Sequence, residues 1–205
     1  MNTRLSILIP SIPSRFEKSF NLYNKLIEET ENMDIEILML TDNKKRSIGL
    51  KREALKNISN GKYFMFVDDD DDIKNIPLLY EATENDVDVI TFKQKSRNTD
   101  GSHFIVTFGL GNEVEHNKNK QGQYVDLKRP PFQVCAWNQK FKNFAYPDIN
   151  YAEDWGWIKQ VLPLAKSEYF IDEVIHLYNF DMNVTEADTS SNELWQNPNI
   201  SQEKK

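Results

Sequence analysis

The stretch YFMFVDDDDD at residues 63–72 decides the fold, because an unbroken apolar run passes directly into five aspartates. A short continuous apolar run is typical of a strand that is buried on both faces, as in a parallel sheet. Open α/β sheets bind their ligands at the carboxyl ends of such strands. The aspartates therefore stand where a ligand site is expected.

The sequence before this stretch predicts a βαβ unit. The apolar run at residues 5–9 is typical of a strand that is buried on both faces, and the apolar run at 35–40 predicts a second strand. Between them, apolar residues recur at helical spacing from Phe16 to about Thr30, which predicts an amphipathic helix. A strand, a helix and a strand in this order form a right-handed crossover in a parallel sheet.

The rest of the chain continues the alternation of helices and strands. Expected elements are helices at 47–58, around 77–83 and at about 154–165, and strands at 87–92, 104–108 and around 169–175. The polar stretch 93–123 is interpreted as loop-rich elaboration around one strand. The pattern predicts an α/β protein with a Rossmann-like, mostly parallel central sheet flanked by helices.

Composition excludes several classes of function. With 25 Lys and Arg against 32 Asp and Glu, the net charge of −7 argues against nucleic acid as a partner, and we expect none. One cysteine excludes a disulfide framework and a zinc site built on several thiolates. No apolar run approaches the ~18 residues of a membrane span, and Pro10 and Pro13 interrupt the N-terminal one. We expect a cytoplasmic protein without an integral membrane segment or signal peptide.

The aspartate run is a candidate metal site. Asp68 and Asp70 form a D-x-D pair that can converge on one hard divalent cation, which also bridges phosphate oxygens. Asp69 with Asp71, or Asp70 with Asp72, has the same spacing, and we choose Asp68 and Asp70 because Asp68 directly follows the strand. A solvated acidic turn is the simpler alternative, but five clustered like charges repel each other unless a cation lies among them. An EF-hand loop is excluded, because Ile73 and Leu79 stand where it needs Gly and Glu. A phosphatase of the haloacid dehalogenase type is a weaker alternative, since Asp72 departs from its motif.

The charged segment before the third strand holds two further candidates. Asp42 closes the second strand, where a carboxylate can bind a ribose or a base. Arg52 lies near the start of a helix that leads to the aspartates, and it is a candidate for ligand contact. Lys44, Lys45 and Lys51 are expected to form a solvated basic helix face.

A second acidic segment is YAEDWGW at residues 151–157. Glu153 and Asp154 begin a helix, and the stabilisation of carboxylates by a helix N-terminus is enough to explain the pair. A carboxylate beside tryptophans also suits a sugar site, in which it takes a hydroxyl proton as a general base. A lone histidine, His176, is expected to be structural rather than a metal ligand.

These segments together resemble the GT-A-fold glycosyltransferases, particularly the inverting family-2 type. The segments are SILIPSIPSRF, LTDN, IGLKREALKNISNGKYFMFVDDDDD, VCAWNQKFKN and NYAEDWGWIKQV, and the resemblance covers about residues 5–180. It implies one GT-A domain over 1–182, with a nucleotide-binding half at about 1–92 and an acceptor-binding half at 93–182. A polar tail over 183–205 follows.

The resemblance also implies an activity and the residues that serve it. The activity is transfer of a sugar, with inversion, from a nucleoside diphosphate donor, a UDP-sugar by analogy, to a hydroxyl of a glycan or other acceptor. Asp154 would be the general base, and Asp70 and Asp68 would hold Mn²⁺ or Mg²⁺. Donor contacts would come from Pro10, Ser11, Asp42, Arg52, Asp68, Asp69, Asp70, Trp137 and Glu153. A non-catalytic module that binds a sugar nucleotide or glycan is the alternative.

Overall fold

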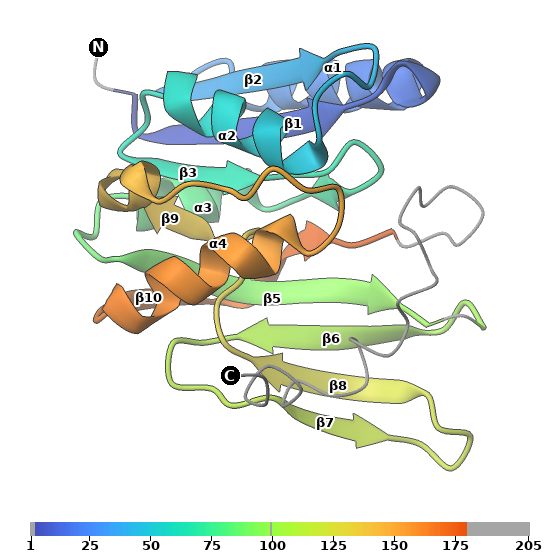
Figure 1. Ribbon diagram of the computed structural model, residues 1–205. Helices are drawn as coiled ribbons and strands as arrows, with labels where there is room; N and C mark the ends of the chain where they lie inside the picture. The colour runs from blue at the N-terminus through green and yellow to red at the C-terminus, as the bar shows by residue number, and fades with distance from the viewer. Residues whose placement is uncertain (1–2, 99, 180–205) are drawn as a thin grey trace, which may run out of the picture.

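The computed structural model describes residues 3–98 and 100–179, which form one mixed sheet flanked by helices (Figure 1). The strand order is β2-β1-β3-β9-β5-β6-β8-β7, and β10 pairs with both β5 and β4. The strands are β1 Leu5–Ser11, β2 Ile35–Thr41, β3 Tyr63–Phe66, β4 Asp72–Ile73, β5 Val89–Arg97, β6 His103–Phe108, β7 Glu115–Lys118, β8 Tyr124–Arg129, β9 Ala136–Asn138 and β10 Glu168–Leu177.

Helices cover both faces of the sheet. They are α1 Phe16–Glu29, α2 Ile48–Ile58, α3 Ile76–Ala82 and α4 Glu153–Val161, with 3₁₀ turns at Pro13–Arg15, Gln139–Asn143 and Leu162–Leu164. Figure 1 shows α2 and α4 on one face and α1 and α3 on the other. Ser47 caps α2, because its side chain accepts a hydrogen bond from the Leu50 backbone N–H.

The predicted α/β fold is confirmed, and so is the parallel arrangement of its first three strands. β1 lies between β2 and β3, with Leu5 in register with Ile35 on one side and with Tyr63 on the other. Every residue of β1 and β3 is buried, as the continuous apolar runs predict. β10 is parallel to β5 and β8 to β6, while β9 joins the two halves of the sheet through antiparallel pairs with β3 and β5.

The polar stretch after β5 is more ordered than the sequence suggests. β7 and β8 pair as an antiparallel hairpin at the edge of the sheet, where loops were expected. All four residues of β7 are exposed, so the sequence EHNK carries no apolar alternation that would reveal a strand. The last predicted helix is also shorter than expected: α4 ends at Val161, and a 3₁₀ turn that contains Pro163 follows it.

The parallel strands bring their carboxyl ends to one edge of the sheet. β1 ends at Ser11, β2 at Thr41 and β3 at Phe66, immediately before the aspartate run. The division into halves at residues 92 and 93 stays a prediction, and the polar tail at 183–205 lies outside the described residues. In the described part of the chain, no helix combines the length and the apolar character needed to cross a membrane.

Candidate active site

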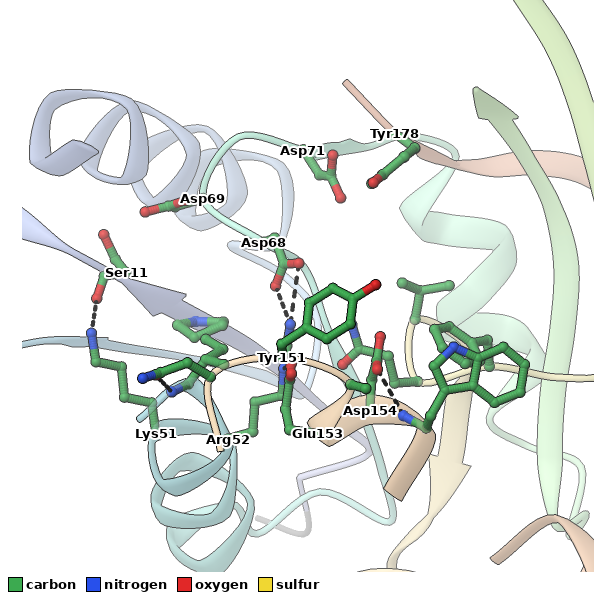
Figure 2. A pocket seen from close by; sticks show the side chains of 18 of the residues that line it. Ser11, Lys51, Arg52, Asp68, Asp69, Asp71, Tyr151, Glu153, Asp154 and Tyr178 are labelled. Carbon is green, nitrogen blue, oxygen red and sulfur yellow. Dashed lines mark hydrogen bonds and ion pairs between the residues drawn. The ribbon is translucent and has the colours of Figure 1, made fainter. Parts of the chain in front are cut away.

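A pocket of about 550 Å³ opens at the carboxyl ends of β1 and β3 (Figure 2). One part of its wall comes from Pro10 and Ser11 at the end of β1 and from Asp68, Asp69 and Asp71 after β3. Another part comes from α2 and from the start of α4. The predicted site residues that line it are Pro10, Ser11, Arg52, Asp68, Asp69, Glu153 and Asp154.

Arg52 connects the two acidic segments of the pocket. Its Nε lies 3.0 Å from Glu153 Oε1, and its Nη2 lies 2.9 Å from Asp68 Oδ1. Figure 2 shows the guanidinium between these two carboxylates. Arg52 and Glu153 are buried, and the two carboxylates hold the pKa of the guanidinium above its ordinary value although burial opposes this. Arg52 therefore fixes the aspartate run against the first turn of α4.

Arg15 occupies the other side of the aspartate run. Its Nη1 lies 2.8 Å from Asp69 Oδ1 and 3.0 Å from Asp70 Oδ2. Burial together with the neighbouring carboxylates Asp68 and Asp69 raises the pKa of Asp70, while the charge of Arg15 opposes the rise. Asp70 is not among the described residues that line the pocket, so the structure brings Asp68 there and leaves Asp70 beside Arg15.

Asp71, on the pocket wall, forms a buried pair with His176 behind it. His176 Nε2 lies 3.3 Å from Asp71 Oδ2, and His176 Nδ1 lies 3.0 Å from Gln94 Oε1. Burial lowers the pKa of His176 to about 4 and raises the pKa of Asp71 well above its usual value. The backbone N–H of Asn179 donates to Asp71, which ties the end of β10 to the aspartate run. His176 is thus a neutral, buried side chain.

The aspartates have the donor chemistry that a hard divalent cation prefers. Mg²⁺ commonly binds through one or two carboxylates and completes its shell with water and substrate phosphates. Among the described residues, no three His, Cys, Asp or Glu side chains converge as a closed metal site. The cation site of Asp68 and Asp70 stays a prediction, because Asp68 lines the pocket while Asp70 pairs with Arg15 and is not among the described residues of the pocket wall. In this structure Arg52 and Arg15 supply the positive charge beside them.

Asp42 is not among the described residues that line the pocket, but its partner Lys51 is. Its Oδ1 lies 2.8 Å from Lys51 Nζ, and its carboxylate accepts hydrogen bonds from the backbone N–H groups of Lys44 and Arg46. These bonds lower the pKa of Asp42, with the hydrogen bond from Lys51 as the main cause. The carboxylate fixes the loop between β2 and α2, and the contact of Asp42 with a nucleotide base stays a prediction.

Lys51 is buried, whereas a solvated basic face was expected. It lines the pocket, and its Nζ donates to the Ser11 carbonyl oxygen at 2.8 Å (Figure 2). Lys51 was expected to behave like its neighbours Lys44 and Lys45, because a charge run does not show which of its members has a carboxylate partner in the folded chain. Lys51 therefore joins the ends of β1 and β2 at the pocket.

Asp154 lies at the start of α4 and lines the pocket (Figure 2). Burial and the neighbouring charge of Glu153 raise its pKa to about 6, against the opposing charge of Arg52. Its Oδ1 accepts the backbone N–H of Trp155 at 2.7 Å. A carboxylate with a pKa near neutrality is suited to general base chemistry in a pocket.

Two glycines let α2 and α4 close on the segment that contains Pro147. A Cβ at Gly49 would lie 1.9 Å from the Pro147 carbonyl oxygen, and a Cβ at Gly156 would lie 2.7 Å from Pro147 Cγ. The Gly49 N–H also donates to the Ile149 carbonyl oxygen. This close packing holds Arg52 on α2 against Glu153 on α4.

Trp137 is a core residue and not a ligand contact. Its side chain is fully buried, its ring packs edge-on against Trp157 and Phe141, and its Nε1 donates to the Phe132 carbonyl oxygen. It is not among the described residues that line the pocket. The prediction of a donor contact from Trp137 is therefore wrong, because β9 carries this side chain into the aromatic core.

Several residues of the pocket wall were not predicted from the sequence. Arg15, Arg129, Gln133, Trp155 and Tyr178 line the pocket but were not among the candidates. Trp155 belongs to the Glu-Asp segment, so its position next to Asp154 was the available signal. The others come from turns or strand ends whose place in space depends on the tertiary fold.

Comparison with solved structures finds the same fold in TarS of S. aureus. Residues 1–349 of TarS superpose with a TM-score of 0.57 at 16% identity, and the UDP complex with 0.59 at 15% identity. The complex with UDP-GlcNAc gives a TM-score of 0.55 at 14% identity. The matches cover 86%, 87% and 87% of this chain, in that order.

This chain spans 60%, 61% and 59% of the length of those three TarS chains. No protein-family model matches the sequence, and no curated protein matches it. At this level of identity the likeness shows the fold, so the chain has the α/β fold of the TarS structures, with a central sheet flanked by helices.

Proposed function

We propose that this chain is a glycosyltransferase that moves a sugar from a nucleoside diphosphate donor to an acceptor hydroxyl with inversion. The observation that carries the proposal is the joining of two acidic segments by Arg52 at the wall of one pocket, with Asp154 beside them. The cationic side chains of such a site can bind a diphosphate, and its aspartates can hold a metal ion beside that diphosphate. A further carboxylate can take a proton from an acceptor hydroxyl. The TarS structures with UDP and UDP-GlcNAc support a UDP-sugar as the donor.

The proposed reaction is a single displacement at the anomeric carbon. Asp154, whose pKa is raised to about 6, is largely ionised at neutral pH and takes the proton of the acceptor hydroxyl as the oxygen attacks. The bond from the anomeric carbon to the diphosphate breaks, and the leaving group departs as the nucleoside diphosphate. Lys51 and Arg52, both on the pocket wall, stabilise the negative charge that develops on it.

The proposal includes Mn²⁺ or Mg²⁺ held by Asp68 and Asp70. When bound, this cation supplies Lewis-acid stabilisation of the diphosphate. Asp68 and Asp70 would exchange part of their contact with Arg52 and Arg15 for the cation. The arginines then remain beside the phosphates as hydrogen-bond donors.

Thermal unfolding with UDP, GDP, CDP and dTDP, each with Mn²⁺ and with a chelator, tests donor binding. A ligand that binds the native state increases the free energy of unfolding, by about 2.7 kcal/mol at a hundredfold excess over Kd, and so raises the melting temperature. We expect a metal-dependent rise with one nucleotide, which names the donor class. No rise with any nucleotide, in protein that unfolds cooperatively, would contradict the proposal.

A further inference from the structure

Arg129, the last residue of β8, lines the pocket but has no part in the proposed displacement. Its guanidinium carbon lies 4.2 Å from the centre of the Phe132 ring and 5.4 Å from that of Trp155. Burial lowers the pKa of this guanidinium, while the charge of Asp154 opposes the change. Arg129 thus lies in an aromatic environment on the side of the pocket where α4 begins.

Arg129 differs in its partners from Arg15, Lys51 and Arg52, the other cations of the pocket wall that are not exposed. Arg15, Lys51 and Arg52 each contact at least one carboxylate at 3.0 Å or less. Throughout residues 3–98 and 100–179, no carboxylate lies within ion-pair distance of Arg129, and no hydrogen-bond acceptor engages its guanidinium. Arg129 is half-buried, and its guanidinium nitrogens are not among the buried polar atoms without a partner, so they remain accessible to an anion that enters the pocket.

Gln133, four residues further along the chain, adds an independent observation. It lines the same pocket and is only 4% exposed. Its Oε1 is buried and has no hydrogen-bond donor among the described residues. A buried amide oxygen without a donor is rare, and a hydroxyl group of a ligand would satisfy it. Arg129 and Gln133 together present donors for an anion and an acceptor for a hydroxyl.

We propose that Arg129 binds a carboxylate or phosphate group of the acceptor, with Gln133 holding one of its hydroxyls, so that the acceptor is an anionic sugar. This inference rests on the proposed function. The acceptor is assigned rather than the donor because Arg129 packs on Trp155, which directly follows the base Asp154. The planar guanidinium binds either kind of anion through two parallel hydrogen bonds.

Calorimetric titration of the full chain, saturated with UDP and Mn²⁺, tests the inference. The probes are glucuronate, glucose 6-phosphate and the uncharged methyl glucoside. We expect at least one anionic probe to bind about tenfold or more tightly than the glucoside, as a charge-assisted hydrogen-bond pair implies. A preference for glucuronate assigns a carboxylate, and a preference for glucose 6-phosphate assigns a phosphate.

Arg129→Gln should remove this preference, while Lys128→Gln should retain it. Lys128 precedes Arg129 in the chain, carries the same charge and has a side chain that is 59% exposed, so it is a matched control. Equal binding of charged and uncharged probes by the wild type, or an unchanged preference in Arg129→Gln, would overturn the inference.

A second variant and a titration without UDP cover the cases in which Arg129→Gln does not fold or UDP does not bind. If Arg129→Gln does not fold, Arg129→Lys retains the charge but loses the planar fork, and its preference should fall without vanishing. The same titrations without UDP separate the two proposals. If UDP does not bind, the proposed donor site fails, while a preference for the anionic probes that depends on Arg129 still supports the anion site.

Discussion

The Nε of Arg52 lies 3.0 Å from Oε1 of Glu153, although the two residues are 101 positions apart in the sequence. The other end of the same guanidinium contacts Asp68, so one buried cation holds two carboxylates that would otherwise repel each other. Removing either carboxylate would leave Arg52 with one anionic partner. Removing Arg52 would leave two partly buried negative charges facing each other.

Arg52→Gln is therefore expected to destabilise the fold by about 3–5 kcal/mol, the range measured when one partner of a buried pair is removed. Urea unfolding measures the change as a lower midpoint at constant slope. Arg97→Gln removes an exposed arginine with the same charge and should change stability by about 0.5 kcal/mol or less. Equal stability of the two variants would show that the Arg52 bridge has no structural role.

The pH dependence of the reaction should follow Asp154. Its pKa is raised to about 6, and the base must be ionised to accept a proton, so kcat/KM should fall about tenfold per pH unit below that value. Glu153→Gln removes a negative charge that raises the pKa of Asp154, so the acid limb should move to lower pH. An acid limb that stays in place, in a variant that remains folded and active, would assign the titration to another group.

Gly49→Ala tests the contact between α2 and the segment at Pro147. The new Cβ would lie 1.9 Å from a carbonyl oxygen, and forcing atoms into a well-packed site typically costs about 1–3 kcal/mol or more. In a helix without this contact, replacing glycine by alanine would increase stability by about 1 kcal/mol. A decrease in the stability of Gly49→Ala would therefore be due to the contact and not to helix propensity. Gly111→Ala, where a Cβ meets no atom within 4 Å, is the control in thermal unfolding.

If the aspartates hold a metal ion, substitutions within residues 68–72 should differ in their effect on metal-dependent nucleotide binding. Asp68→Asn should remove most of the Mn²⁺-dependent rise in melting temperature with the nucleotide, because Asp68 lines the pocket. Asp72→Asn should retain it, since Asp72 pairs with Lys25 at 2.6 Å and is not among the described residues of the pocket wall. If both variants behave like the wild type, the cation binds elsewhere or the nucleotide does not need it.

The sequence predicted the parts of the fold that depend on local patterns. β1, β2 and β3 carry apolar runs, and the aspartates directly follow the third of these strands. Because the strands are parallel, the aspartates could be predicted to lie at the same edge of the sheet as the carboxyl ends of β1 and β2. The exposed strand β7 lacks such a pattern, and so the hairpin that ends at Arg129 could not be predicted.

The sequence predicted pocket residues best where carboxylates directly follow a strand, as Asp68 and Asp69 follow β3. It predicted them less well where the position of a side chain depends on tertiary contacts. Lys51 belongs to a run of charged residues that is typical of a solvent-exposed surface. Its ammonium group nevertheless contacts Asp42 and the Ser11 carbonyl oxygen, and the side chain is buried. Trp137 has a sequence context that suggested a ligand contact, but packing against Trp157 places it in the core. In both cases the deciding partner is far away in the sequence.

Asp154→Asn tests the central claim most directly, with UDP release from UDP-GlcNAc measured across a panel of acceptors at neutral pH and UDP affinity measured in parallel. General base catalysis contributes about 10²–10⁴-fold, so we expect the variant to release UDP at least about a hundredfold more slowly while UDP binds as tightly as to the wild type. A variant as active as the wild type would contradict the role of Asp154. Failure of folded wild-type protein to bind UDP or to release it with any acceptor would contradict the proposed UDP-sugar transferase activity.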